Sequence, residues 1–152
     1  MPIDAATPVN ARQRRLQEVL RRWEDGYNAG IGFVDECYWP EASAYFPGGE
    51  VHGREQFLKL EDAILKAAPS RRIRVDRIHF SGEDLAVVEA VVLDTTRPNF
   101  LSPFCAVLTF RGERIIQDRT YMDSARWPGA QGAAGIATKG GLGRAAGSTI
   151  AG

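Results

Sequence analysis

The stretch RIIQDRTYMD, residues 114–123, decides the fold, because it ends a series of extended segments and carries a carboxylate inside one of them. Three similar segments precede it, at residues 71–80, 85–94 and 102–110, and all are rich in Val, Ile, Leu or Phe. The linkers SGED, TTRPN and RGE contain the glycine, proline and polar residues that favour turns. Four strands joined by short turns predict an antiparallel meander.

The part of the chain before these strands has a helical pattern. Residues 33–39, FVDECYW, predict a short second helix or turn that Pro40 ends, and SAYF, residues 43–46, predicts a short strand. A third helix begins at GREQF, and Pro69 ends it. The first helix is predicted over residues 11–29, where one face gathers the apolar side chains Leu16, Val19, Leu20, Trp23 and Tyr27.

Three helices followed by a run of strands predict an α+β fold, in which the helices cover one face of a cone-shaped, curved antiparallel sheet. The chain has 152 residues, of which 44% are hydrophobic and 25% charged, as expected for one globular domain. We place this domain at residues 11–127, after a flexible N-terminus of residues 1–10. Residues 128–152 are rich in Gly and Ala with few large apolar groups, which predicts a flexible tail.

The charges and cysteines exclude several classes of partner. With 19 basic and 19 acidic residues, the chain has no net field to attract nucleic acid or a membrane surface, and we expect neither partner. The longest apolar run, LAVVEAVVL, is far shorter than a membrane span, and the first residues lack a signal-peptide core, which favours the cytoplasm. Cys37 and Cys105 are predicted to be reduced structural thiols. His52 and His79 have no third ligand at suitable spacing, so we expect no metal site.

Three motifs resemble the nuclear transport factor 2-like superfamily, in its branch of SnoaL-like and ketosteroid-isomerase-like proteins. YNAG closes the first predicted helix, EVHGREQF opens the third, and RGERIIQDRTYMD resembles the terminal strand of that family. The resemblance covers about residues 11–127 and implies a conical pocket, roofed by the helices and floored by the concave sheet. The superfamily includes isomerases, cyclases, dehydratases, epoxide hydrolases and binding modules, so the resemblance leaves the activity open.

The catalytic sets of these relatives match the chain only in part. Ketosteroid isomerases use a tyrosine and two aspartates, and the matching positions here hold Trp23, Ala106 and Phe46. Of the Asp, Arg, Asp relay of limonene-epoxide hydrolases, one carboxylate remains, at Glu89. Scytalone dehydratase is similar at RRWEDGYNAG, where Tyr27 falls on a tyrosine that polarises the substrate. SnoaL-type cyclases imply a sheet aspartate that acts as acid and base without a metal or cofactor.

The resemblance also orients the strands, and it implies that Asp118 points into the cone. Glu89, on a neighbouring strand, and Glu61, on the third helix, are expected to face the same apolar cavity. Apolar walls and like charges raise the pKa of a carboxyl group toward neutral pH. The predicted inward residues of the last strand are Ile116, Asp118, Thr120 and Met122, and the outward ones are Ile115, Gln117, Arg119, Tyr121 and Asp123.

We therefore predict that Asp118 and Glu89 form a general acid/base pair, with Tyr27 or Tyr45 as the hydrogen-bond donor to a substrate oxygen. An alternative is that arginines such as Arg74 or Arg119 hold these carboxylates, or that the carboxylates face outward. An aromatic lining of Trp23, Tyr38, Trp39, Tyr45, Phe46, Phe57 and Phe104 suits a flat ligand. The predicted substrate-binding residues are Trp23, Tyr45, Phe46, Phe57, Glu61, Phe104, Thr120 and Met122.

These features predict a cofactor-independent cyclase, isomerase or dehydratase that acts on a hydrophobic, oxygenated small molecule, such as a polyketide or terpenoid intermediate. The alternative is a non-catalytic module of the same fold that binds a small molecule or a protein. The convex sheet face carries Arg119, Tyr121 and Asp123, and the resemblance implies that a homodimer forms through it.

Overall fold

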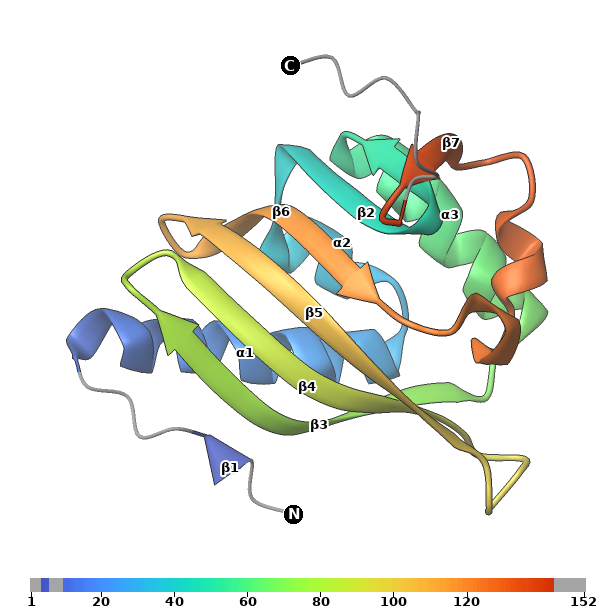
Figure 1. The fold of residues 1–152 in the computed structure, drawn as a ribbon, viewed down its shortest axis with the longest axis horizontal. Helices are drawn as coiled ribbons and strands as arrows, with labels where there is room; N and C mark the ends of the chain where they lie inside the picture. The colour runs from blue at the N-terminus through green and yellow to red at the C-terminus, as the bar shows by residue number, and fades with distance from the viewer. Residues whose placement is uncertain (1–3, 6–9, 144–152) are drawn as a thin grey trace.

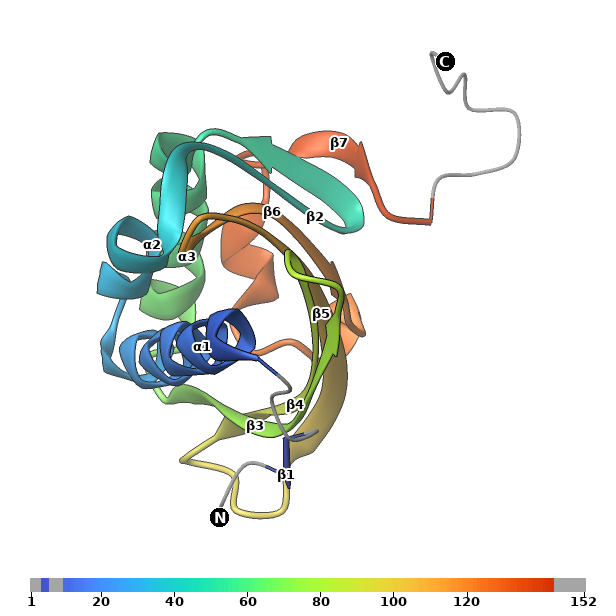
Figure 2. The same cartoon turned by 90° about the vertical axis from the view of Figure 1, so that its left-hand side faces the viewer.

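A strongly curved sheet wraps around a layer of three helices in the computed structural model, which describes residues 4–5 and 10–143 (Figures 1 and 2). The helices are α1 (Ala11–Ala29), α2 (Gly32–Cys37) and α3 (Arg54–Ala67). The strands are β1 (Asp4–Ala5), β2 (Tyr38–His52), β3 (Arg71–Ser81), β4 (Leu85–Asp94), β5 (Leu101–Arg111), β6 (Arg114–Tyr121) and β7 (Thr138–Gly141). The predicted α+β class and its three helices are confirmed.

The predicted meander forms the centre of the sheet, whose strand order is β1-β3-β4-β5-β6-β2-β7. Strands β3 to β6 pair antiparallel in sequence, whereas β2 joins β6 in parallel, so the complete sheet is mixed. β2 is much longer than the predicted SAYF strand, and its ribbon folds back on itself (Figure 2). The N–H of Gly53, just after β2, bonds to the carbonyl of Ala42 at 2.8 Å and joins the two arms.

The first helix is fixed at both ends and along its length. Asn10 caps its N-terminus, accepting a hydrogen bond from the backbone N–H of Gln13 at 2.8 Å, and Gly30 ends it. The side-chain amide of Asn28 bonds both backbone groups of Ile73 in β3, at 2.7 and 2.9 Å. The five apolar residues of the predicted helix face are all buried, so the helix packs its apolar face inside the curved sheet.

The prediction of a flexible tail from residue 128 is wrong up to residue 143. Residues 124–141, called here the closing segment, contain two short 3-10 turns (Ser124–Arg126 and Ala130–Ala133) and then β7, which pairs antiparallel with β2. Small residues allow this packing, because a Cβ atom on Gly132 would lie only 2.5 Å from the carbonyl oxygen of Ala63 in α3. Residues 144–152 lie outside the described residues.

The predicted flexible N-terminus, residues 1–10, lies mostly outside the described residues, but Asp4–Ala5 form β1 and pair in parallel with β3. Both cysteines are free, as predicted. Among the described residues, no helix is long and apolar enough to span a membrane.

Candidate active site

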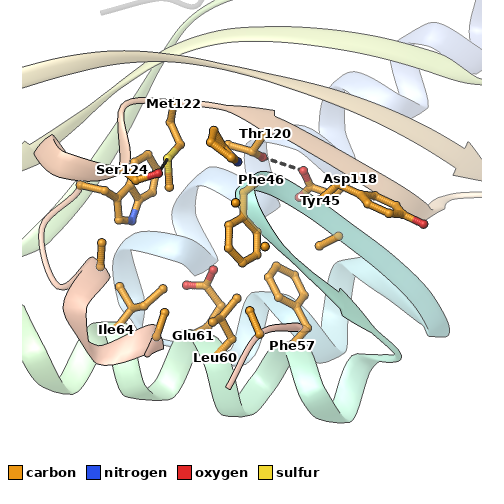
Figure 3. A pocket seen from close by; sticks show the side chains of 18 of the residues that line it. Tyr45, Phe46, Phe57, Leu60, Glu61, Ile64, Asp118, Thr120, Met122 and Ser124 are labelled. Atoms are coloured by element: carbon orange, nitrogen blue, oxygen red, sulfur yellow. Dashed lines mark hydrogen bonds between the residues drawn. The ribbon is translucent and has the colours of Figure 1, made fainter. Parts of the chain in front are cut away.

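A cavity of about 410 Å³ lies between the inner face of the sheet, helices α1 and α3, and the closing segment (Figure 3). Its volume is within the usual range for small-molecule sites. Aromatic and aliphatic side chains form most of its wall. All the residues predicted to bind substrate line it: Trp23, Tyr45, Phe46, Phe57, Glu61, Phe104, Thr120 and Met122.

Asp118 lies at the wall of this cavity and is only 4% exposed. Its Oδ2 atom accepts a hydrogen bond from the Tyr38 hydroxyl at 2.6 Å, and its Oδ1 atom accepts one from Thr120 Oγ1 at 2.7 Å. The indole N–H of Trp23 in turn donates to the Tyr38 oxygen at 3.0 Å. Asp118 therefore faces inward, as predicted, and ends a chain of hydrogen bonds that starts on α1.

Burial raises the pKa of Asp118, although its hydrogen bonds from Thr120 and Tyr38 act in the opposite direction. The pKa of Tyr38 is raised well above its ordinary value, by burial and by the adjacent Asp118 carboxylate. Tyr38 is therefore a neutral donor near neutral pH, while Asp118 is biased toward its protonated form. A carboxyl group with a raised pKa can both donate and accept a proton near neutral pH.

Glu61 forms a second polar point in the cavity wall, and Figure 3 shows its carboxylate pointing into the open space. Arg71, which is fully buried, donates to Glu61 Oε2 at 3.1 Å, and its guanidinium lies 4.3 Å from the centre of the Tyr27 ring. Burial raises the pKa of Glu61, while the charge of Arg71 lowers it. Glu61 is therefore held as one half of a buried ion pair.

Tyr27 lines the same cavity and is 6% exposed. Burial raises its pKa, so the phenol stays protonated. Among residues 10–143, no group hydrogen-bonds to its hydroxyl, which leaves this donor available to a ligand. Tyr27 thus lies in the cavity wall, and its role as donor to a substrate oxygen stays a prediction.

The structure corrects the prediction for Glu89, which lies on the outer face of the sheet with a side chain 52% exposed. It contacts His79 Nε2 at 2.5 Å on the neighbouring strand. Residues opposite each other in an antiparallel pair share a face. Glu89 stands opposite Cys105 of β5, and Asp118 stands opposite Leu108 of the same strand. Cys105 and Leu108 are on opposite faces of β5, and Leu108 is in the core. Glu89 therefore cannot pair with Asp118, and the inward residues of β4 are Ala86, Val88, Ala90 and Val92.

Two aromatic residues also differ from the prediction. Tyr45 borders the cavity, but its ring packs edge-on against His52, and Figure 3 shows its hydroxyl directed away from Glu61. Trp39 lies outside the cavity, where its indole N–H donates to the carbonyl of Arg111 at 2.6 Å. Neither is placed as a hydrogen-bond donor to a molecule in the cavity.

Neither Arg74 nor Arg119 holds a predicted carboxylate. Arg74 bonds to Asp76 at 2.7 Å, and Arg119 bonds to Gln117 at 3.3 Å. Asp118 instead has two hydroxyl donors, and no cation of the described part of the chain is in direct contact with its carboxylate.

Sequence reasoning gave Tyr38 only a place in the aromatic lining and missed its bond to Asp118. No alternation marked it, because Pro40 is exposed at the same parity and the pairing with β6 shifts register between Tyr38 and Ser43. It also missed the closing segment, which contributes Trp127, Ala130, Ala133 and Ala137 among others to the cavity wall. Sparse, small apolar residues of this kind carry no strong periodic pattern.

Among the described residues, no group of three or more His, Cys, Asp or Glu side chains could hold a metal ion. Besides two indole N–H groups, the polar side-chain groups of the described lining residues are carboxyl and hydroxyl groups and one ammonium group, from Lys139. This set can bind an oxygenated organic molecule by hydrogen bonds and can transfer a proton to or from it.

Comparisons of the fold give a consistent picture. A protein from Jannaschia sp. CCS1, provisionally described as a SnoaL-like polyketide cyclase, is 20% identical, with a TM-score of 0.62 over 81% of this chain and 89% of that one. Bal32a, from a soil-derived mobile gene cassette, is 19% identical, with a TM-score of 0.67 over 77% of this chain and 96% of that one.

A protein from Catenulispora acidiphila with a ketosteroid isomerase-like fold, solved with trimethylamine, is 18% identical, with a TM-score of 0.63 over 72% of this chain and 88% of that one. No curated protein matches the sequence. The family model for the SnoaL-like domain matches residues 17–117. The chain therefore belongs to the SnoaL-like domain family, within the nuclear transport factor 2-like superfamily.

Proposed function

We propose that this protein is a cofactor-independent acid/base enzyme that acts on a hydrophobic, oxygenated small molecule, with Asp118 as the group that transfers the proton. The observation that supports this most is a 4% exposed carboxyl group at the wall of an apolar cavity, with hydroxyl donors on both oxygens and, within residues 10–143, no cation in contact. An uncompensated buried charge costs several kcal/mol of folding free energy, which a passive pocket has no reason to keep.

The arrangement suits proton removal from a carbon next to a carbonyl group. Asp118 accepts the proton, and the electron pair of the broken C–H bond moves onto the carbonyl oxygen. The free hydroxyl of Tyr27 donates a hydrogen bond to that oxygen and stabilises its negative charge. Asp118 then returns the proton to another atom of the substrate, which completes an isomerisation, or to a leaving hydroxyl group, which completes an elimination.

Exchange of carbon-bound hydrogen with solvent deuterium tests this step without knowledge of the natural substrate. Bicyclic ketones such as 2-tetralone fit the class, and NMR follows the loss of the proton next to the carbonyl. We expect the protein to accelerate this exchange by about 100-fold or more, Asp118→Asn to abolish the acceleration and Tyr27→Phe to reduce it. A ketone that binds in the cavity without faster exchange would contradict the acid/base function.

A non-catalytic binding module remains the second candidate, because both oxygens of Asp118 already accept hydrogen bonds from the protein itself. In this case a bound ketone would not exchange in the wild-type protein, and Asp118→Asn would bind it with unchanged affinity. The same two proteins thus distinguish the candidates.

We also propose that a homodimer forms through the outer sheet face. Tyr121 and Leu101 are exposed there, at 49% and 46%, and they are the large hydrophobic side chains most open to solvent among the described residues. An open cleft lined by Val87, Val91 and Tyr121 occupies the same face. Sedimentation should show a dimer that Tyr121→Glu converts to a monomer, and a wild-type monomer at high concentration would refute this.

A further inference from the structure

One wall of the cavity comes from the closing segment, which follows the residues that match the family model, 17–117. The segment is held by side chains of the domain. The Gln56 amide donates to the carbonyl of Ile136 at 3.0 Å, and Glu50 Oε1 accepts from the backbone N–H of Gly141 at 3.1 Å. Hydrogen bonds thus fix the closing segment against the domain, at the place where a ligand would lie.

Lys139, in β7, is on the cavity side of this segment. It stands opposite Gly49 of β2, and opposite residues of an antiparallel pair share a face. A Cβ atom on Gly49 would lie 2.5 Å from the ring of Phe46 and 3.2 Å from Ala137. Figure 3 shows Phe46 inside the cavity, so the Lys139 side chain shares the face that lines it.

Among the described residues that line the cavity, Lys139 is also the only cationic one. The other two lysines, Lys59 and Lys66, form ion pairs with Glu55 and Asp62 on the outer side of α3. Lys139 is exposed at the mouth, and within residues 10–143 no carboxylate lies in ion-pair distance of it. Of the acidic groups in the cavity, Glu61 is already paired with Arg71.

We propose that the closing segment sets the ligand preference of the cavity and that Lys139 selects molecules with an apolar ring body and a terminal carboxylate. The body fills the aromatic cavity, and the carboxylate stays at the mouth beside the ammonium group. A charge at the mouth retains part of its hydration, so its binding carries little desolvation cost. This inference rests on the proposed function only in taking the cavity as a ligand site.

A matched pair of probes isolates the charge. 2-Naphthoate and 2-naphthamide share the same ring and nearly the same shape, and calorimetric titration gives the Kd of each. We expect the wild-type protein to bind the naphthoate about two- to fivefold more tightly, with a smaller ratio at high salt. Lys139→Gln should bring the ratio to about one, mainly by weakening naphthoate binding, and Lys139→Arg should keep it. Lys59→Gln controls for the general loss of one positive charge.

Each outcome decides the matter. Equal affinity of the wild-type protein for both probes, or a preference that survives in Lys139→Gln, would overturn the role of Lys139 and leave the proposed acid/base function intact. A preference lost equally in Lys59→Gln would show an effect of overall charge, which also overturns it. Failure of both probes to bind would overturn the ligand cavity, and with it both proposals.

Discussion

Replacement of Asp118 by asparagine removes a buried charge with almost no change of shape. Burial raises the pKa of Asp118 above 3.8, the ordinary value of an aspartate. A group whose pKa is raised on folding stabilises the fold below its unfolded pKa and loses this contribution as pH rises through the folded pKa. Asparagine does not titrate. The advantage of the wild-type protein over Asp118→Asn should therefore shrink as pH rises from 4 to 8.

The magnitude follows from two opposing effects. Each unit by which folding raises the pKa of Asp118 is equivalent to about 1.4 kcal/mol, or about 3–6 °C in Tm for a chain of this size. Against this, Asp118 accepts two hydrogen bonds, at 2.6 and 2.7 Å, and the amide offers only one acceptor oxygen. These bonds act on the ionised form and are already part of the net rise in the pKa of Asp118, so they weaken the pH trend without reversing it.

Thermal unfolding followed by circular dichroism, in steps from pH 4 to 8, measures the difference. Asp94→Asn is the matched control, because hydrogen bonds from Thr96 and Ser70 lower the pKa of Asp94, and the sign reverses. Asp94 stabilises the fold above its unfolded pKa and loses this contribution only below about pH 4, so the difference between wild-type protein and Asp94→Asn should stay nearly constant from pH 4 to 8. A difference between wild-type protein and Asp118→Asn that stays constant or grows with pH would refute a raised pKa for Asp118.

Three further changes test the rest of the site. Glu61→Gln leaves the fully buried Arg71 without its carboxylate and should lower the free energy of unfolding by about 3–5 kcal/mol in urea; a loss below 1 kcal/mol would show that the pair does not form. Gly132→Ala places a Cβ atom 2.5 Å from the Ala63 carbonyl, so proteolysis should cut the closing segment faster while the domain stays folded. Glu89 lies on the outer face, so Glu89→Gln should leave the rate of hydrogen exchange in the ketone unchanged. A large decrease in this rate would show that Glu89 takes part in the reaction.

The strand prediction succeeded where the two faces of a strand differ and failed where they do not. β4 reads LAVVEAVVL, which is apolar at both parities, so alternation alone did not fix which side Glu89 occupies. In β6 the inward position of Asp118 was predicted correctly, but Ile115 is also fully buried. A bulge shifts the register, with Phe110 opposite Ile115 and Thr109 opposite Gln117, and no sequence pattern marked the extra residue.

The closing segment was missed for a different reason. Gly and Ala usually signal chain that cannot offset its ordering entropy, yet here small size is what the packing requires. Gly132 and Gly129 approach the backbone of α3 where no side chain would fit. Such packing depends on the shape of a distant helix, which composition alone does not describe.

The hydrogen-bond chain also indicates which oxygen of Asp118 is available for chemistry. The Tyr38 oxygen accepts a hydrogen bond from the Trp23 N–H, and the Tyr38 hydroxyl donates its own proton to Asp118 Oδ2. Tyr38 is 1% exposed, and this bond has little room to rearrange. Thr120, which bonds to Oδ1, lines the cavity, and its hydroxyl can rotate toward a ligand. Oδ1 is therefore the atom that can exchange a proton with a bound molecule, while Oδ2 holds the carboxyl group in place.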